Sequence, residues 1–327
     1  MTRSLVCSGL IAATTLIAAL ISGCAPEDRA TGAVDRSFTV SGPLRLELKN
    51  ASGESRITAG SPGVVRIHAE FRVYAWSWGE AQERLRELQN DPPISQDGNV
   101  VRLGGGNWGW VWPNTSINYS VTVPPDSELE GSSASGSVSV LGISGPVDIN
   151  VVSGNASAQG IAGDTRIHAV SGSIRVFDIR GSADVSTVSG SIDVNKVQGQ
   201  LHARSTSGTT WIERPAGDVQ ADAISGGMNI MDATGDLRAR TVSGGISIDG
   251  NPSSGRFWDI NTMSGSVVLG LRSNASFRLY AHSASGTVDL GIPAATQQND
   301  RHSVTARIGD GAGRVEIGTF SGGISIH

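Results

Sequence analysis

The chain has 327 residues and a formal net charge of −5 at pH 7. It is mildly acidic and has no cluster of basic residues, which argues against nucleic acid as a partner because nucleic-acid binding needs concentrated positive charge. Glycine supplies 43 residues, about twice its usual share of roughly 7%, so the pattern of glycine along the chain is informative.

Residues 1–23 have the pattern of a bacterial signal peptide. A short positive stretch with Arg3 precedes an apolar stretch, Leu5 to Ile21, which is too short for a typical membrane span. It ends in Ile21-Ser22-Gly23-Cys24, which resembles the bacterial lipobox, in which the cysteine is lipidated and becomes the new N-terminus. We therefore expect a lipid on Cys24; an ordinary secretory signal with a chance cysteine is the alternative.

Such a lipid anchor would hold the mature chain in the cell envelope. By resemblance to the bacterial sorting pattern, Ala25 favours the outer membrane, if the cell has one. Cys7 lies in the removed segment, so the mature chain would have no disulfide and no thiolate metal site. Residues 24–36, which start at the lipidated cysteine, are polar and non-periodic and indicate a short tether.

Residues 37–125 lack the glycine lattice of the following region and predict a small β-rich unit that caps it. A single helix is expected at residues 79–90, with Leu85 and Leu88 on one face. Strands are expected at residues 38–48, 55–58, 64–74, 100–103 and 117–123.

From residue 126 to residue 327 the sequence predicts a repeat domain, because glycine follows two interleaved lattices with an 18-residue period. The first consists of Ser-Gly pairs, whose glycines are Gly136, Gly154, Gly172, Gly190, Gly208, Gly226 and Gly244. The second lies half a period away, at Gly145, Gly163, Gly181, Gly199, Gly217 and Gly235.

Within each repeat, apolar residues recur at +2, +4, +7, +11, +13 and +16 from the Ser-Gly glycine, and we expect them to face inward. One repeat supplies Ile174, Val176, Ile179, Ala183, Val185 and Val188 at these six positions, and Val242 is the +16 residue of another repeat. Two short strands and two glycine-bearing turns per repeat follow from this spacing. The predicted fold is therefore all-β, a parallel β-solenoid of ~18-residue two-strand coils that stack about 4.8 Å apart behind the N-terminal cap.

Residues on the outward rows partly alternate in charge, as Asp148, Arg166 and Asp184 do at +12. Stacking in register would pair these charges between neighbouring coils.

The register continues with longer steps after Gly250, breaks between Pro293 and His302, and resumes up to a final strand at residues 324–327. We expect that last coil to leave an open edge through which copies of the chain could associate.

Several segments resemble the putative-adhesin family of bacterial envelope proteins, whose function is unassigned. They are F-T-V-S-G-P-L-R-L-E-L at residues 38–48, Y-S-V-T-V-P-P before the repeats, and the recurring V-S-G-S-I and G-D-L-R-A units. The resemblance covers nearly all of residues 37–327. It implies a β-solenoid exposed at the cell surface and offers no catalytic residues to carry over.

Tryptophan is the candidate binding residue. Two tryptophans flank one turn and three alternate on one face of an extended segment; they form either a hydrophobic cap over the solenoid end or an aromatic platform for a glycan, a lipid or another protein. The last lies at an outward position between Asp193 and Asn229 of neighbouring coils, so we expect it to be at least partly exposed. The candidate surface comprises Trp76, Trp78, Trp108, Trp110, Trp112 and Trp211.

Neither a metal site, a cofactor nor a catalytic residue is predicted. Aspartates after half-period glycines lack the G-x-G-x-D pattern of calcium repeats; they are Asp164, Asp218 and Asp236. The histidines are dispersed and lack an H-E-x-x-H motif; they are His68, His168, His202, His282, His302 and His327.

Three functions remain open. The first is a non-catalytic binding or scaffold module whose partner is a glycan or another envelope protein. The second is a self-associating structural element. The third is a polysaccharide-acting enzyme, for which Asp300, Arg301 and His302 in the break are the available side chains.

Overall fold

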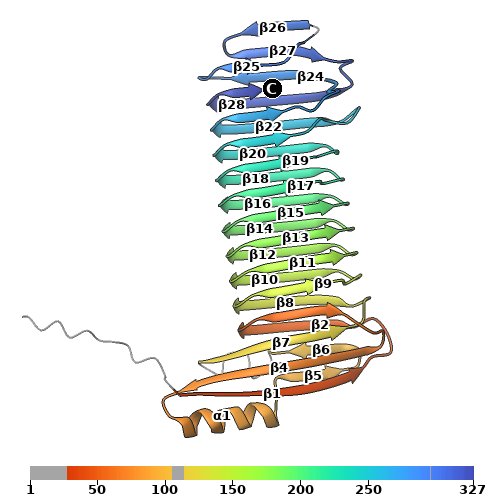
Figure 1. The fold of residues 1–327 in the computed structure, drawn as a ribbon, viewed down its shortest axis with the longest axis vertical. Helices are drawn as coiled ribbons and strands as arrows, with labels where there is room; N and C mark the ends of the chain where they lie inside the picture. The colour runs from red at the N-terminus through yellow and green to blue at the C-terminus, as the bar shows by residue number, and fades with distance from the viewer. Residues whose placement is uncertain (1–27, 105–113, 295) are drawn as a thin grey trace, which may run out of the picture.

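The computed structural model describes residues 28–104, 114–294 and 296–327, which form a long column of two facing β-sheets with one helix at its base (Figure 1). The strands of sheet A are, in spatial order, β1 (Asp28–Thr39), β4 (Val64–Ala75), β7 (Thr115–Val123), β3 (Ser55–Ala59), β9 (Val138–Leu141), β11 (Ala156–Ile161), β13 (Ile174–Ile179), β15 (Ile192–Val197), β17 (Thr210–Glu213), β19 (Met228–Met231), β21 (Ile246–Asp249), β23 (Val267–Gly270), β29 (Ile324–Ile326) and β25 (Val288–Leu290).

Sheet B forms the other wall of the column. Its strands, from the opposite end, are β26 (Thr296–Asp300), β27 (Ser303–Ile308), β24 (Phe277–Ser283), β28 (Gly313–Ser321), β22 (Phe257–Ser264), β20 (Leu237–Ser243), β18 (Val219–Ser225), β16 (Leu201–Ser207), β14 (Ala183–Ser189), β12 (Thr165–Ser171), β10 (Val147–Ser153), β8 (Glu128–Ser135), β2 (Arg45–Ser52), β6 (Val100–Leu103) and β5 (Ile94–Asp97).

The predicted parallel solenoid is confirmed. Each 18-residue coil gives one strand to each sheet, and equivalent residues of successive coils pair in parallel, as Ile149 does with Ile167 in sheet B. Ile174 and Val176 from sheet A and Val185 from sheet B are buried in the aliphatic core between the sheets. Because each coil adds its own layer of such residues, the core extends continuously along the column.

One inward position of the prediction is wrong. Val188 and Val242, at +16, are exposed, whereas Thr187 just before Val188 is buried. The reason is that β14 runs to the end of its coil, so strict alternation places +11, +13 and +15 inward and +16 outward. The inward hydroxyl of Thr187 lies 3.4 Å from the carbonyl oxygen of Gly172, which accepts its hydrogen bond.

Glycine is required at the Ser-Gly corner for two reasons. Gly172 has a φ of +145°, and a Cβ there would lie 1.8 Å from the carbonyl oxygen of Gly154 in the preceding coil. At the half-period corner close approach alone excludes a side chain, since a Cβ on Gly181 would lie 2.5 Å from the carbonyl oxygen of Gly163. The two lattices in the sequence are therefore the two corners of the column.

The stack begins earlier than predicted, within the region assigned to a separate cap. Strands β2 and β3 form the first coil: Ser52 pairs with Ser135, and a Cβ on Gly136 would lie 2.0 Å from the carbonyl oxygen of Gly53. Residues 60–127 are an insertion between the first and second coils. Their strands β4, β7 and β6 extend both sheets beyond the first coil towards the base.

The predicted tether is also shorter than residues 24–36. Asp28–Thr39 forms β1, which pairs antiparallel with β4 along its whole length. Ala30 and Val34 are buried, and Gly32 faces the side chains of Leu85 and Gln89. These small residues give a weak hydrophobic signal, which is why the strand reads as polar in the sequence.

The predicted helix is present as α1 (Trp78–Asn90), which closes the base of the core. Ser77 caps its N-terminus by accepting a hydrogen bond from the Glu80 N–H at 3.3 Å. Leu85 and Leu88 are buried. The helix packs on β1 and β4 and lies below them at the base of the column (Figure 1). Within the described residues no helix has the length and apolarity that crossing a membrane requires.

The far end of the column corrects the prediction of an open C-terminal edge. The last coil, β28 and β29, lies between the β22–β23 coil and the β24–β25 coil, with parallel partners on both sides. Residues 293–302, expected to be a loop, contribute β26, which forms an antiparallel hairpin with β27 on the outer side of β24. The last coil therefore lies inside the stack and leaves no open edge of its own, and the end strands of the two sheets at this tip are β25 and β26.

Two adjacent glycines test the corner constraint. We expect Gly226→Ala to lower the free energy of unfolding by about 2–5 kcal/mol, because a Cβ there would lie 1.9 Å from the carbonyl oxygen of Gly208 and φ is +135°. Gly227→Ala is the matched control, because its Cβ would meet only the Gly245 carbonyl oxygen at 3.9 Å. Urea unfolding measures both; equal losses would contradict the constraint.

Candidate functional site

Three of the six candidate tryptophans, Trp76, Trp78 and Trp211, lie among the described residues, and they do not form one surface. Trp76 and Trp78, at the junction of β4 and α1, are 71% and 56% exposed, so they do not cap the core. Trp211 lies on β17, seven strands away from β4 in sheet A, or roughly 30 Å at about 4.8 Å per strand. Trp108, Trp110 and Trp112, like Cys24, lie outside the described residues.

The predicted position of Trp211 is confirmed. It pairs with Asp193 on one neighbouring coil and Asn229 on the other, and it is 49% exposed on the outer face of sheet A. Its immediate neighbours in the outward row are polar. Trp211 is therefore an isolated exposed ring rather than part of an aromatic platform.

Two of the three side chains considered for catalysis, those of Asp300 and His302, form hydrogen bonds with backbone groups. His302 Nδ1 lies 2.6 Å from the carbonyl oxygen of Gly286, and a carboxylate oxygen of Asp300 accepts a hydrogen bond from the Arg301 N–H at 2.6 Å.

Near the base, His68 Nδ1 lies 2.8 Å from Asp35 Oδ1. That hydrogen bond raises the pKa of His68.

The aspartates that follow the half-period glycines cap the next coil. Asp164 accepts a hydrogen bond from the Ser182 N–H at 2.9 Å, and Asp218 accepts one from the Asp236 N–H at 3.1 Å. Asp236 in turn accepts one from the Phe257 N–H at 2.9 Å. In the part of the chain that the structure describes, no three His, Cys, Asp or Glu side chains are grouped as a metal site.

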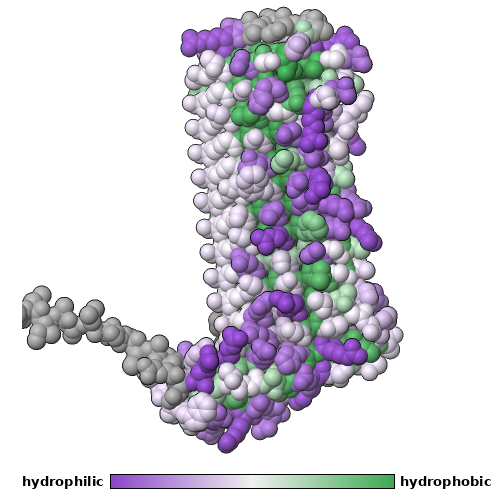
Figure 2. Space-filling model, viewed as in Figure 1, coloured by the Kyte–Doolittle hydropathy of each residue, from purple (hydrophilic) through white to green (hydrophobic). Residues whose placement is uncertain are grey.

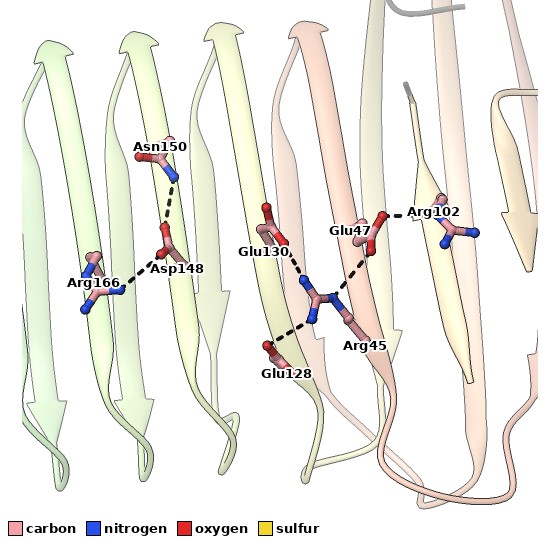
Figure 3. Close-up of polar contacts among 8 residues, drawn as sticks. All are labelled: Arg45, Glu47, Arg102, Glu128, Glu130, Asp148, Asn150 and Arg166. Carbon is pink, nitrogen blue, oxygen red and sulfur yellow. Dashed lines mark hydrogen bonds and ion pairs between the residues drawn. The ribbon is translucent and has the colours of Figure 1, made fainter. Parts of the chain in front are cut away.

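A charged row runs along the outer face of sheet B, as the alternating residues at +12 predicted. Arg166 Nη1 lies 3.6 Å from Asp148 Oδ2 on the neighbouring coil, and Arg102 Nε lies 3.1 Å from Glu47 Oε2 (Figure 3). Each such exposed pair contributes about 0–1 kcal/mol. The row therefore favours the correct register of the coils more than it stabilises them.

Arg45 joins the acidic part of this row. Its guanidinium lies 2.8 Å from Glu130, 3.4 Å from Glu47 and 3.6 Å from Glu128, and Figure 3 shows it between the three carboxylates. The hydrogen bond to Glu130 and the charge of Glu128 raise the pKa of Arg45. Without this cation, Glu47 and Glu130 would be adjacent like charges in paired strands. A shallow groove of about 480 Å³ lies beside Glu130 and continues to His202.

A second row on sheet B, next to the Ser-Gly corner, is apolar and exposed. We call it the apolar ladder; its side chains are 47–66% exposed, and Thr206 is the polar member within it. On the face of the column that Figure 2 shows, where β1 and β4 of sheet A lie in front (Figure 1), hydrophilic and hydrophobic side chains are interspersed. The ladder consists of Val152, Val170, Val188, Ile224, Val242, Met263 and Phe320.

Two apolar grooves follow the ladder. One of about 520 Å³ is lined by Val152, Val170 and Val188, and one of about 480 Å³ by Val242, Met263 and Phe320. The sequence prediction missed this surface because it placed +16 inside. The alternation of +11, +13 and +15 was the signal that could have revealed it.

Three comparisons relate the chain to known proteins. No curated protein matches the sequence. One similar solved structure is that of a putative cell adhesion protein from Clostridium sporogenes, with 10% sequence identity, 90% of this chain and 99% of that chain covered, and a TM-score of 0.20. A score this low establishes no common overall shape.

A family model described as Toastrack DUF4097 matches residues 216–327. The coils before residue 216 repeat the same pairing and the same glycine corners back to the first coil. Residues 216–327 are thus similar to the Toastrack DUF4097 family, and this match supports the resemblance of the chain to a putative-adhesin family of unassigned function.

Proposed function

We propose that this protein is an envelope-anchored, non-catalytic binding module of the adhesin-like kind, and that the apolar ladder is its binding surface. The observation that carries the proposal is the ladder itself: seven large apolar side chains, each about half exposed, lie in one row on a rigid column. Contiguous exposed apolar surface on a soluble domain marks an interaction site. Two of the candidate catalytic side chains, those of Asp300 and His302, are by contrast engaged in hydrogen bonds with backbone groups.

The chemistry of the ladder favours another protein as the partner. Its members are mainly aliphatic, with valine at four of the seven positions, whereas sugar rings are bound through aromatic faces and convergent polar groups. Covering the exposed part of one such side chain stabilises a complex by about 1 kcal/mol. Several adjacent members together would support specific binding of an apolar protein face.

A second copy of this chain is the alternative occupant. Successive rungs of the ladder are about 4.8 Å apart, which is the spacing between paired strands. Another solenoid has the same spacing, so two ladders could interdigitate along their length. Such side-by-side pairing differs from an association through the C-terminal coil, which lies inside the stack.

Site-specific photocrosslinking in cells tests the ladder. We expect p-benzoylphenylalanine at Thr206, within the ladder, to give a discrete protein adduct, and the same residue at Asp193, exposed on sheet A, to give none. The triple variant Val170→Thr, Val188→Thr and Ile224→Thr should abolish the adduct while keeping the fold, because Thr206 already occupies this row.

Sedimentation of the purified chain identifies the partner class. A dimer that dissociates in the triple variant would show pairing between copies, and a monomer with an adduct of different mass would show a second protein. Equal adducts at Thr206 and Asp193, or no adduct at Thr206, would contradict the ladder as the binding surface.

The anchor is the second part of the proposal. The signal pattern of residues 1–23 and the lipobox ending in Cys24 support a lipid on that cysteine, and Ala25 supports the outer membrane where the cell has one. The membrane would then be a partner through the lipid chains.

A pair of cysteine variants tests the anchor. We expect Cys24→Ser to move the protein from the membrane fraction to the soluble fraction, because the acyl chains supply the hydrophobic attachment. Cys7→Ser is the control and should leave the distribution unchanged, because Cys7 lies in the removed segment. Fractionation and mass spectrometry of the mature N-terminus measure both; membrane retention of Cys24→Ser without acylation would refute the anchor.

A further inference from the structure

Two exposed tryptophans lie together at one corner of the base, away from the ladder. Trp76 has the highest exposed fraction, 71%, among the large hydrophobic side chains that the structure describes, and Trp78 is 56% exposed. They flank Ser77, whose side chain caps α1, so the turn that presents both rings is held by the helix start. The backbone that carries the rings is held by the cap, and the rings themselves lie outside the core.

This corner is also where the chain enters the described fold. Asp28, the first residue of β1, pairs with Ala75, which directly precedes Trp76; Figure 1 shows the start of β1 and the end of β4 meeting at the lower left. Cys24 is four residues before Asp28. Four residues span at most about 14 Å, so a lipid on Cys24 would hold this corner close to the membrane surface.

The neighbouring side chains suit a phospholipid headgroup region. Arg72 and Trp76 are exposed, and the half-buried Tyr74 lies between them on the outward side of β4. Arg29 on β1 is exposed and pairs with Tyr74. Tryptophan and tyrosine favour membrane–water interfaces, and arginine binds phosphate oxygens.

We propose that Arg29, Arg72, Tyr74, Trp76 and Trp78 form a docking patch for the phospholipid surface that holds the anchor. The proposal rests on the lipid anchor at Cys24. The patch gives the column a second attachment beside the lipid chains, so that the base faces the bilayer and the coils lead away from it. The outer side of α1 exposes Glu83 and Glu87 together with Arg86 and so has little net charge, and we therefore assign the main attachment to the aromatic rings.

Fluorescence quenching in vesicles tests the patch. The full-length acylated chain is reconstituted in phosphatidylcholine vesicles with and without brominated acyl chains, which quench tryptophans at the interface. We expect the double variant Trp76→Phe and Trp78→Phe to lose most of the quenchable fluorescence. The matched control Trp211→Phe, which removes an exposed ring from the middle of the column, should keep it.

Vesicle flotation separates the two ways in which the proposal can fail. A wild-type chain that does not float would overturn the anchor and the patch with it. A wild-type chain that floats, but whose quenching is unchanged in the double variant, would overturn the patch alone. Thermal unfolding of each variant confirms that the fold is kept, which the exposure of all three rings leads us to expect.

Discussion

The backbone contact at the Ser-Gly corner sets the spacing of the whole column. Each corner glycine faces the carbonyl oxygen of the glycine one coil below, at a distance where no Cβ fits. Every coil must therefore return to this corner in register, and extra residues are tolerated only at the opposite corner. Residues 60–127, 251–256, 271–276 and 291–312 all leave the stack there, between a strand of sheet A and the next strand of sheet B. One side of the column is thus uniform, whereas the other accepts insertions.

The regular part of this fold was predictable because its signals are local. The two glycine lattices gave the coil length and both corners, and the apolar pairs at +2/+4 and +11/+13 gave the inward faces. The first coil was missed because the next Ser-Gly corner glycine after Gly53 is Gly136. The insertion between these two glycines hides the 18-residue period. Strand β1 was missed because Ala30 and Gly32 pack through small side chains. The position of the last coil depends on long-range pairing, which no periodicity reveals.

The candidate surfaces also differ in how far the sequence alone predicts them. The charged row follows from the register alone, so the pairing of Asp148 with Arg166 could be expected. The apolar ladder depends on where each sheet B strand ends, since one further residue of extended backbone turns Val188 outward. The patch at the base needs the pairing of Asp28 with Ala75, which brings the chain entry beside Trp76. A role for the exposed tryptophans could therefore be proposed only once their neighbours in space were known.

The inserted final coil has a consequence for the order of assembly. Strands β24 to β27 are synthesised before β28, yet β28 separates them from β22. Coils up to β23 can stack as they are made, because each finds its partner in the coil just completed. The outermost strands must wait as an unattached segment until residues 313–327 arrive and join both sides. The native pairing of the tip can therefore be completed only after β28 is made, and a chain interrupted before β28 would lack the native partner of the β22–β23 edge and leave it open to pairing with other strands.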